Sequence, residues 1–115
     1  MPASVDRDTF AQQVLAAPQP TLVHFWAPWC GLCRSIAPVL ESIQTEWRHA
    51  LKIVDVNADE NLQLANAYKL SCLPTLVLFH RGRAVRRLEG LQHRDRVYQE
   101  VARMAAEFAG GSPQS

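Results

Sequence analysis

The sequence has no long hydrophobic run, almost no net charge and only three cysteines. Its 115 residues include 12 basic and 11 acidic side chains, which gives a formal net charge of +1. So small a charge creates no broad field that would attract nucleic acid or an anionic membrane. No stretch is apolar for long enough to cross a bilayer, and Asp6, Arg7 and Asp8 interrupt the segment where a secretory signal would be apolar. We therefore expect a cytoplasmic protein that binds neither nucleic acid nor membrane.

The small number of cysteines argues against a fold held together by disulfides. Three cysteines cannot all pair within one chain, and a 115-residue domain with 48% hydrophobic residues can form a core without them. A bridge between Cys30 and Cys33 would close too short a loop to stabilise the fold much. In a reducing compartment we therefore expect this pair to be catalytic or metal-binding rather than structural.

The chain shows no repeats and no linker, so we expect a single domain over residues 1–109. Residues 110–115 (GGSPQS) contain only small and polar residues and predict a flexible tail.

The first half of the chain predicts helices on either side of a buried strand. Thr21 to Ala27 (TLVHFWA) is almost continuously apolar, which is typical of a central strand with both faces covered. Before it, Asp6 is a suitable N-cap for a helix from Arg7 to Ala16. After it, apolar residues at helical spacing predict a long helix from Cys33 to about His49.

The second half continues the alternation and predicts an α/β fold. Leu51 to Val56 indicates a strand parallel to the first and next to it, because a strand, helix, strand run makes a crossover connection. Asp59 is expected to cap a short helix that ends near Tyr68. Thr75 to His80 and Arg83 to Glu89 predict two strands joined by a tight turn. A last helix presents one apolar face, formed by Val97, Val101, Met104, Ala105 and Phe108.

The segment WAPWCGLC lies where the central strand stops and the long helix begins. Unpaired N–H groups and the positive end of the helix dipole favour an anion there, so the first turn would stabilise a thiolate at Cys30. Cys33 follows about one helical turn later, within reach of Cys30. We predict that Cys30 attacks a disulfide in a target protein and that Cys33 resolves the mixed disulfide. The pair is then the redox group, and we expect no bound cofactor and no metal.

The residues FWAPWCGLCR, the long helix with Pro38, and LPT at Leu73 to Thr75 resemble the thioredoxin family. The resemblance runs from about Val5 to Phe108. It implies a thioredoxin fold, with a central mixed sheet of four or five strands flanked by four helices. It also implies a protein-disulfide reductase, expected as a monomer, that thioredoxin reductase or another thiol reductant returns to the reduced state. By the same resemblance the bond before Pro74 is cis, and target peptides dock on Trp29, Gly31, Leu32, Leu73, Pro74, Gly90 and Leu91.

Two departures from the family pattern concern the chemistry. Leu32 replaces the usual proline of the motif, which adds an N–H near the sulfurs and loosens the first turn, so we expect a less strongly reducing pair. His24 stands where the family has a buried aspartate that assists proton transfer, and Asp55 stands where a lysine is common. On adjacent strands the two could form a hydrogen-bonded pair in which imidazole is the base. The alternative is a core histidine satisfied by a backbone carbonyl.

Two further departures concern the sheet edge and a third thiol. Only Met1 to Ser4 are available for a strand before the residues that start the first predicted helix, so we expect the family's first strand to be short or missing and Leu51 to Val56 to lie at the sheet edge. Cys72, directly before Leu73, is either a regulatory thiol or a small residue in a loop.

Two rival functions stay open at this point. Cys30, Cys33, Cys72 and His24 offer enough soft ligands for a metal or an iron-sulfur cluster, but a single CxxC does not match the two ligand pairs of closed zinc sites. A thioredoxin-like binding or chaperone module with slow turnover would carry the same residues.

Overall fold

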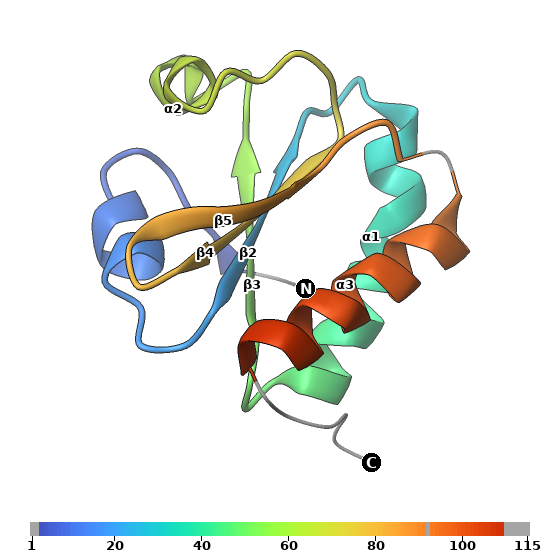
Figure 1. Cartoon of the computed structure of the whole chain (residues 1–115). Coiled ribbons are helices and arrows are strands. Elements are labelled where there is room, and N and C mark those ends of the chain that lie inside the picture. Colours follow the sequence, from blue (N-terminus) through green and yellow to red (C-terminus); the bar gives the residue numbers. More distant parts are fainter. Residues whose placement is uncertain (1–2, 92, 110–115) are drawn as a thin grey trace.

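A five-stranded mixed sheet forms the centre of the computed structural model, which describes residues 3–91 and 93–109 (Figure 1). The strands lie in the order β1-β3-β2-β4-β5. Strand β3 runs parallel to β1 and β2, whereas β4 is antiparallel to β2 and β5. Their bounds are Ala3–Ser4 for β1, Thr21–Trp26 for β2, Lys52–Asn57 for β3, Thr75–His80 for β4 and Arg83–Leu88 for β5.

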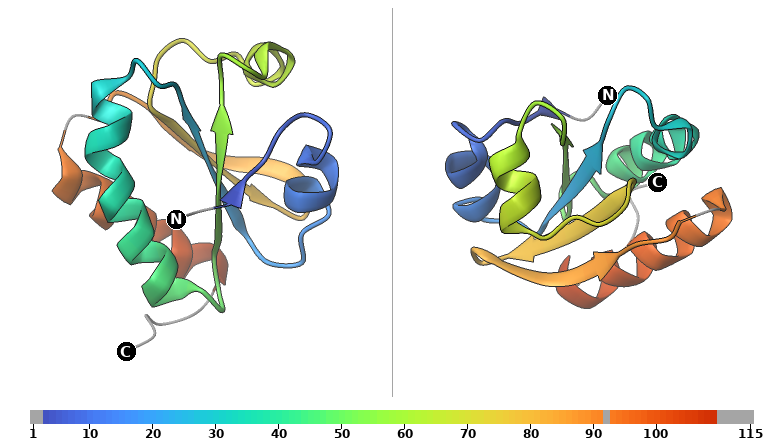
Figure 2. Two further views of the ribbon diagram at one scale, coloured as in Figure 1. Left: turned by 180° about the vertical axis from the view of Figure 1, so that it is seen from behind. Right: turned by 90° about the horizontal axis from the view of Figure 1, so that it is seen from above.

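Four helical segments flank the sheet within the described residues. Helices α1 and α3 cover one face, while η1 and α2 lie on the side of the other (Figures 1 and 2). No helix in this part of the chain is long and apolar enough to cross a membrane. The bounds are Ala11–Leu15 for η1, Gly31–Trp47 for α1, Leu62–Ala67 for α2 and Arg94–Ala109 for α3. The mixed sheet with its flanking helices is the expected thioredoxin fold, and the predicted tail falls outside the described residues.

Strand β2 occupies the middle of the sheet and is buried on both faces. Residues Thr21 to Phe25 are all buried, which explains why this stretch of sequence is apolar without alternation. Alternate residues of β2 face opposite helix layers. Leu22 packs with the apolar residues of α1 and α3, whereas Val23 packs in the second cluster with Phe10 and Val14.

The two long helices bury the faces that their sequence patterns predicted. Ile36, Leu40, Ile43 and Trp47 of α1 are buried, and so are Val97, Val101, Met104 and Ala105 of α3. Phe108 is partly buried against the same cluster. This cluster fixes α1 on the sheet and thereby fixes the position of its first turn.

The first helix is shorter than predicted and is of a different type. Asp6 does act as a cap, because its Oδ1 accepts hydrogen bonds from the N–H groups of Asp8 and Thr9 at 3.0 Å each, but the segment that it caps is a turn. The helix itself is a π-helix over Ala11–Leu15, with a 2.8 Å bond from the N–H of Ala16 to the carbonyl of Ala11. The expected α-helix from residue 7 to 16 was therefore wrong. Phe10 and Val14 are both buried in the core, but their four-residue spacing is equally compatible with an α-helix, so it does not explain the π-helical geometry.

Strand β3 is not at the sheet edge, so the expectation for Leu51 to Val56 was wrong. Strand β1 pairs with it, placing Ala3 opposite Val54 and Ser4 opposite Asp55. The N–H of Val5 extends this pairing with a 2.8 Å bond to the carbonyl of Asp55. The first strand is short, as expected, yet its two residues are enough to cover part of β3.

Tyr98 joins α3 to α1 through a 2.6 Å hydrogen bond from its hydroxyl to Oε2 of Glu46. This bond, followed by burial and the charge of Glu46, raises the pKa of Tyr98 above its ordinary value near 10.0. Because the folded state holds the phenol proton more tightly, the stabilisation is present below the unfolded pKa and is lost as the pH rises through the raised folded pKa.

We expect Tyr98→Phe to lower the free energy of unfolding by about 1 kcal/mol at pH 7, which is typical of one lost hydrogen bond. The variant should also lose less stability than wild type between pH 9 and 11, because it has no phenol to ionise. Urea unfolding across this range measures both effects, and Glu46→Gln serves as the matched change at the acceptor. Equal stabilities and equal pH slopes would contradict the assigned bond.

Candidate active site

Cys30 and Cys33 form a disulfide at the N-terminus of α1. Cys30 is the N-cap residue of this 17-residue helix, and its Sγ accepts a 3.0 Å hydrogen bond from the N–H of Cys33. The Cα atoms of the two cysteines are 5.3 Å apart. An N–H of the first turn and the positive end of the helix dipole therefore both act on the sulfur of Cys30.

The two cysteines are largely buried and lie beneath an exposed rim. Cys30 is 5% exposed and Cys33 is 2% exposed, whereas Trp29 is 67% exposed. Gly31 and Leu32 are also exposed. A partner reaching the disulfide must therefore contact apolar residues that flank Cys30 in the chain.

The segment with Pro74 lies at the same end of the sheet as the disulfide. The Leu73–Pro74 bond is cis, as the resemblance implied. Thr75 pairs with Phe25 near the end of β2 that leads to Cys30. Pro74 is buried and Leu73 is half-buried.

Of the last two predicted docking residues, Gly90 is exposed and Leu91 is buried. Gly90 is exposed and has a positive φ of 65°. Leu91 is only 2% exposed and packs with the core residues of α1 and α3. The Leu91 side chain therefore belongs to the core beside α1 and α3, and the predicted docking at this position stays a prediction for its backbone.

His24 and Asp55 form the pair that their positions on adjacent strands predicted. They are directly opposite each other in the β2–β3 register, and Nδ1 of His24 lies 3.2 Å from Oδ1 of Asp55. Both side chains lie on the α1 and α3 face, because alternation places them with the core residues Leu22 and Ile53. The bond runs to a carboxylate and not to a backbone carbonyl, which removes the alternative of a histidine satisfied by the main chain.

The hydrogen bond to Asp55 fixes which nitrogen of His24 carries the proton. A carboxylate only accepts, so Nδ1 must donate and the lone pair of the neutral ring lies on Nε2. Nε2 is buried and has no hydrogen-bonding partner among residues 3–91 and 93–109. The ring is thus set up to accept a proton at Nε2, and the imidazolium so formed would face the carboxylate of Asp55.

Two residues near the disulfide were not identified from the sequence. Asp59 was expected to cap α2, but that helix begins at Leu62, and Oδ2 of Asp59 instead accepts a 2.7 Å bond from Nε1 of Trp29. Arg34 donates a 2.5 Å bond to the carbonyl of Pro28. Arg34 could have been noticed as a cation one helical turn after Cys30, whereas the role of Asp59 depends on a contact across 30 residues.

Cys72 is a free, exposed thiol. The carbonyl of Cys72 accepts a 2.7 Å bond from the hydroxyl of Thr75, which holds the turn before Pro74. In the part of the chain that the structure describes, no three histidine, cysteine, aspartate or glutamate side chains are arranged to hold a metal ion.

Comparison with known proteins gives consistent matches. The family model described as Thioredoxin matches residues 1–103. Thioredoxin 1 of Nostoc sp. is 47% identical over 83 residues, which cover 72% of this chain and 78% of that protein. The chloroplastic Thioredoxin M-type of Chlamydomonas reinhardtii is 40% identical over 98 residues, 85% of this chain and 70% of the relative.

A third relative joins two activities in one protein. The Bifunctional thioredoxin reductase/thioredoxin of Mycobacterium leprae is 40% identical over 82 residues, 71% of this chain and 18% of that protein. Together with the disulfide at the start of α1, these matches show that the chain belongs to the thioredoxin family and is a thiol-disulfide oxidoreductase.

Proposed function

We propose that this protein reduces disulfides in other proteins through a cycle in which Cys30 attacks and Cys33 resolves. The observation that carries the proposal is the Cys30–Cys33 disulfide at the N-terminus of α1, with the N–H of Cys33 directed at the sulfur of Cys30. In the reduced protein the same N–H and the helix dipole favour a thiolate at Cys30. Cys33, the more buried of the two, then has the resolving role.

The cycle balances two electrons. The Cys30 thiolate attacks one sulfur of the target disulfide, forms a mixed disulfide and releases the other sulfur as a thiolate, which takes up a proton. Cys33 loses its proton and attacks the sulfur of Cys30, which releases the second target thiolate. The target disulfide has been reduced to two thiols, and the Cys30–Cys33 pair has been oxidised.

His24 is proposed as the base for the second step. Its free Nε2 takes the proton of Cys33, directly or through water, while Asp55 holds the ring and stabilises the imidazolium. The charges differ from those that the resemblance attributes to these two positions, where an aspartate is the base and a lysine lies beside it. Here the base is a neutral imidazole and its partner is the anion. Asp55 acts through His24 and is a positioning residue.

Target segments are proposed to dock around the rim of the disulfide. Trp29, Gly31 and Leu32 offer exposed surface on one side, and Leu73 with Pro74 lies on the other. Gly90 adds an exposed backbone. The free thiol of Cys72 lies beside this surface, and we propose that modification or intermolecular pairing there reduces target binding.

The reductant is proposed to be thioredoxin reductase, acting in the cytoplasm on a monomer without a bound cofactor. The name of the Mycobacterium leprae relative links a thioredoxin to a reductase in one chain, which supports this pairing. A reducing compartment would supply the electrons that a disulfide reductase passes on.

Insulin reduction tests the function directly. With dithiothreitol as electron donor, the protein should accelerate precipitation of the insulin B chain, and with thioredoxin reductase and NADPH it should do so again. Activity in both assays supports a general reductase, and activity with dithiothreitol alone points to a dedicated reductant. No acceleration in either assay would favour a binding module over an enzyme.

Leu32→Pro tests the contribution of the motif's third position to the reduction potential. Proline would remove one N–H near the sulfurs and stiffen the first turn of α1, so we expect the variant to be more strongly reducing than wild type. Equilibration of each protein with glutathione buffers of known ratio measures the potential. Equal potentials for the two proteins would contradict this role of Leu32.

A further inference from the structure

An apolar groove of about 220 Å³ lies beside the disulfide rim, on the side of α2. Trp29, Leu62, Ala65, Leu70 and Leu73 form its apolar lining. Two of these residues connect it to the active site, since Trp29 precedes Cys30 and Leu73 precedes the cis proline. The groove is therefore continuous with the place where a target disulfide must lie.

Leu62 is the unusual residue of this groove. It is the first residue of α2, yet its side chain is 63% exposed, almost as much as that of Trp29. Leu62 and Trp29 both line the groove and are exposed to water, so covering them with an apolar side chain lowers the free energy. The groove thus suits an apolar side chain of a target segment.

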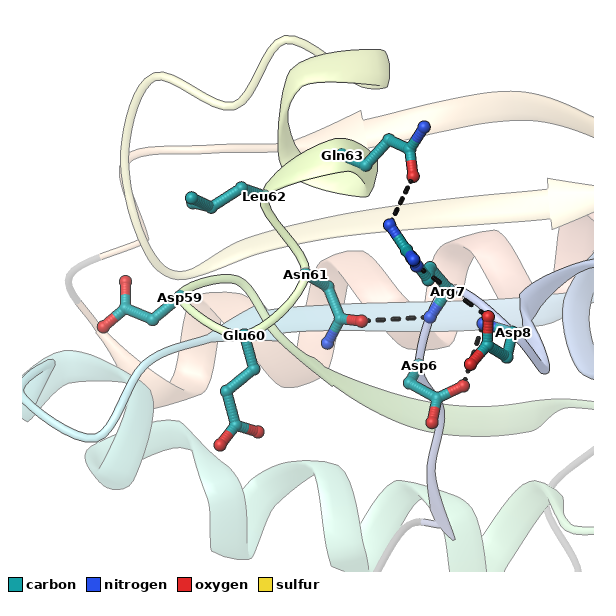
Figure 3. Close-up of a pocket in the computed structure, with 8 residues that line it drawn as sticks. All are labelled: Asp6, Arg7, Asp8, Asp59, Glu60, Asn61, Leu62 and Gln63. Carbon is teal, nitrogen blue, oxygen red and sulfur yellow. Dashed lines mark hydrogen bonds and ion pairs between the residues drawn. The ribbon is translucent and has the colours of Figure 1, made fainter.

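A second hollow, of about 420 Å³, lies next to the groove, and four of the eight residues that line it, all drawn in Figure 3, are acidic. Asp59 and Leu62 line both. The residues that line the second hollow include four with a carboxylate, Asp6, Asp8, Asp59 and Glu60, and one with a guanidinium, Arg7. In Figure 3 the carboxylates of Asp59 and Glu60 point away from Arg7. The charge of this hollow is therefore complementary to a cation.

The contacts within the hollow decide which carboxylates can bind a cation. Asp59 accepts from Trp29, and Asp6 accepts from backbone N–H groups. Arg7 donates to Gln63 at 3.0 Å and lies 3.8 Å from Asp8, with both side chains exposed (Figure 3). The carboxylate of Glu60 makes no hydrogen bond or ion pair with another described residue. Glu60 and the weakly paired Asp8 are thus the most available groups.

We propose that the preferred targets are extended segments that carry a disulfide-bonded cysteine, then an apolar residue, then a lysine or arginine. The order follows from the surface, because the disulfide rim, the apolar groove and the acidic hollow succeed one another. The apolar side chain lies against Leu62 and Trp29, and the cation lies at the acidic hollow, where Glu60 and Asp8 offer separate carboxylates on either side of Arg7. This inference deepens the proposed function and rests on it.

Short activated peptides test the preference. Each peptide has one cysteine in a disulfide with 2-thiopyridine, followed by a leucine and then two lysines. A second set of peptides carries the same residues in the reverse order. Attack by the Cys30 thiolate joins the peptide to Cys30 and releases pyridine-2-thione, whose absorbance gives the rate. The comparison peptides carry two glutamates in place of the lysines, or a serine in place of the leucine. Each reaction rate is divided by the rate at which the same protein reduces dipyridyl disulfide.

We expect the lysine peptide to react about three to ten times faster than the glutamate peptide at low salt, with the difference shrinking at high salt. The double variant Asp8→Asn with Glu60→Gln should remove most of this difference. Leu62→Ser should reduce the preference for leucine over serine about fivefold. Glu100→Gln removes one charge on α3, on the other face of the sheet, and should change neither preference.

Two outcomes separate the inference from the proposed function. If dipyridyl disulfide is reduced but lysine and glutamate peptides react equally, or if the variants retain the wild-type preferences, the groove does not select targets. If dipyridyl disulfide itself is not reduced, the proposed function fails.

Discussion

Replacing Cys33 by serine is expected to turn the protein into a trap for its targets. The Cys30 thiolate would still attack a target disulfide, but serine cannot attack the resulting mixed disulfide, so the complex persists. Turnover of insulin should fall by about a thousandfold or more, as is usual when a reacting group is removed. Non-reducing gel electrophoresis followed by mass spectrometry should show the target joined to Cys30.

Cys30→Ser should give the same loss of turnover without any trapped complex. Cys72→Ser is the matched control, because it removes the third thiol and leaves the Cys30–Cys33 pair intact. Wild-type turnover is expected for this control. Trapping at Cys72, or substantial turnover in Cys30→Ser, would disprove the assigned order of attack.

His24→Gln is expected to slow resolution of the mixed disulfide by about tenfold to a hundredfold at pH 7, within the range for loss of a general base. Glutamine can still donate a hydrogen bond to Asp55 but cannot take up a proton. Stopped-flow kinetics of a peptide disulfide from pH 5 to 9 should therefore show that the variant has lost one pH-dependent step of the wild-type profile. Asp55→Asn should have a smaller effect, because it leaves the imidazole in place.

The pH profile distinguishes proton transfer from a purely structural role for His24. Thermal unfolding of each variant reports any loss of stability from a change at a buried site. His49→Gln, at an exposed position after α1, is the control and should keep the wild-type profile. A His24→Gln profile of unchanged shape, whatever its stability, would exclude the base role.

Several features of the fold followed from local sequence patterns because one dominant force determines each of them. The continuous apolar run of β2 requires burial on both faces, and the apolar stripes of α1 and α3 require a core on one side. Strand β4 was predicted to the residue, and Arg81 with Gly82 forms the expected tight turn, with positive φ at both. At Gly82 the positive φ of 79° is what favours glycine, because a Cβ there would make only an ordinary contact with the carbonyl oxygen of Leu15.

The sequence predictions that differ from the structure concern residues whose surroundings include parts of the chain far away in the sequence. Asp59 was a reasonable helix cap by local chemistry, but its carboxylate accepts a hydrogen bond from the indole N–H of Trp29 instead. The first helix is a π-helix over Ala11–Leu15 in place of the longer α-helix that the spacing predicted, although Phe10 and Val14 are buried as that spacing requires. The resemblance implied that Leu91 contributes to the docking surface, whereas its side chain is buried in the core.

The sequence by itself determined the redox pair, the central strand that leads to it and the helix that begins after it, because each is encoded within a few consecutive residues. The tertiary structure decided between the two alternatives for His24 in favour of the bond to Asp55, and it alone revealed the unpaired Nε2 and the apolar groove with the acidic hollow beside it. These features bring together residues far apart in the chain. Their geometry depends on strand register and helix packing, which local propensity does not fix.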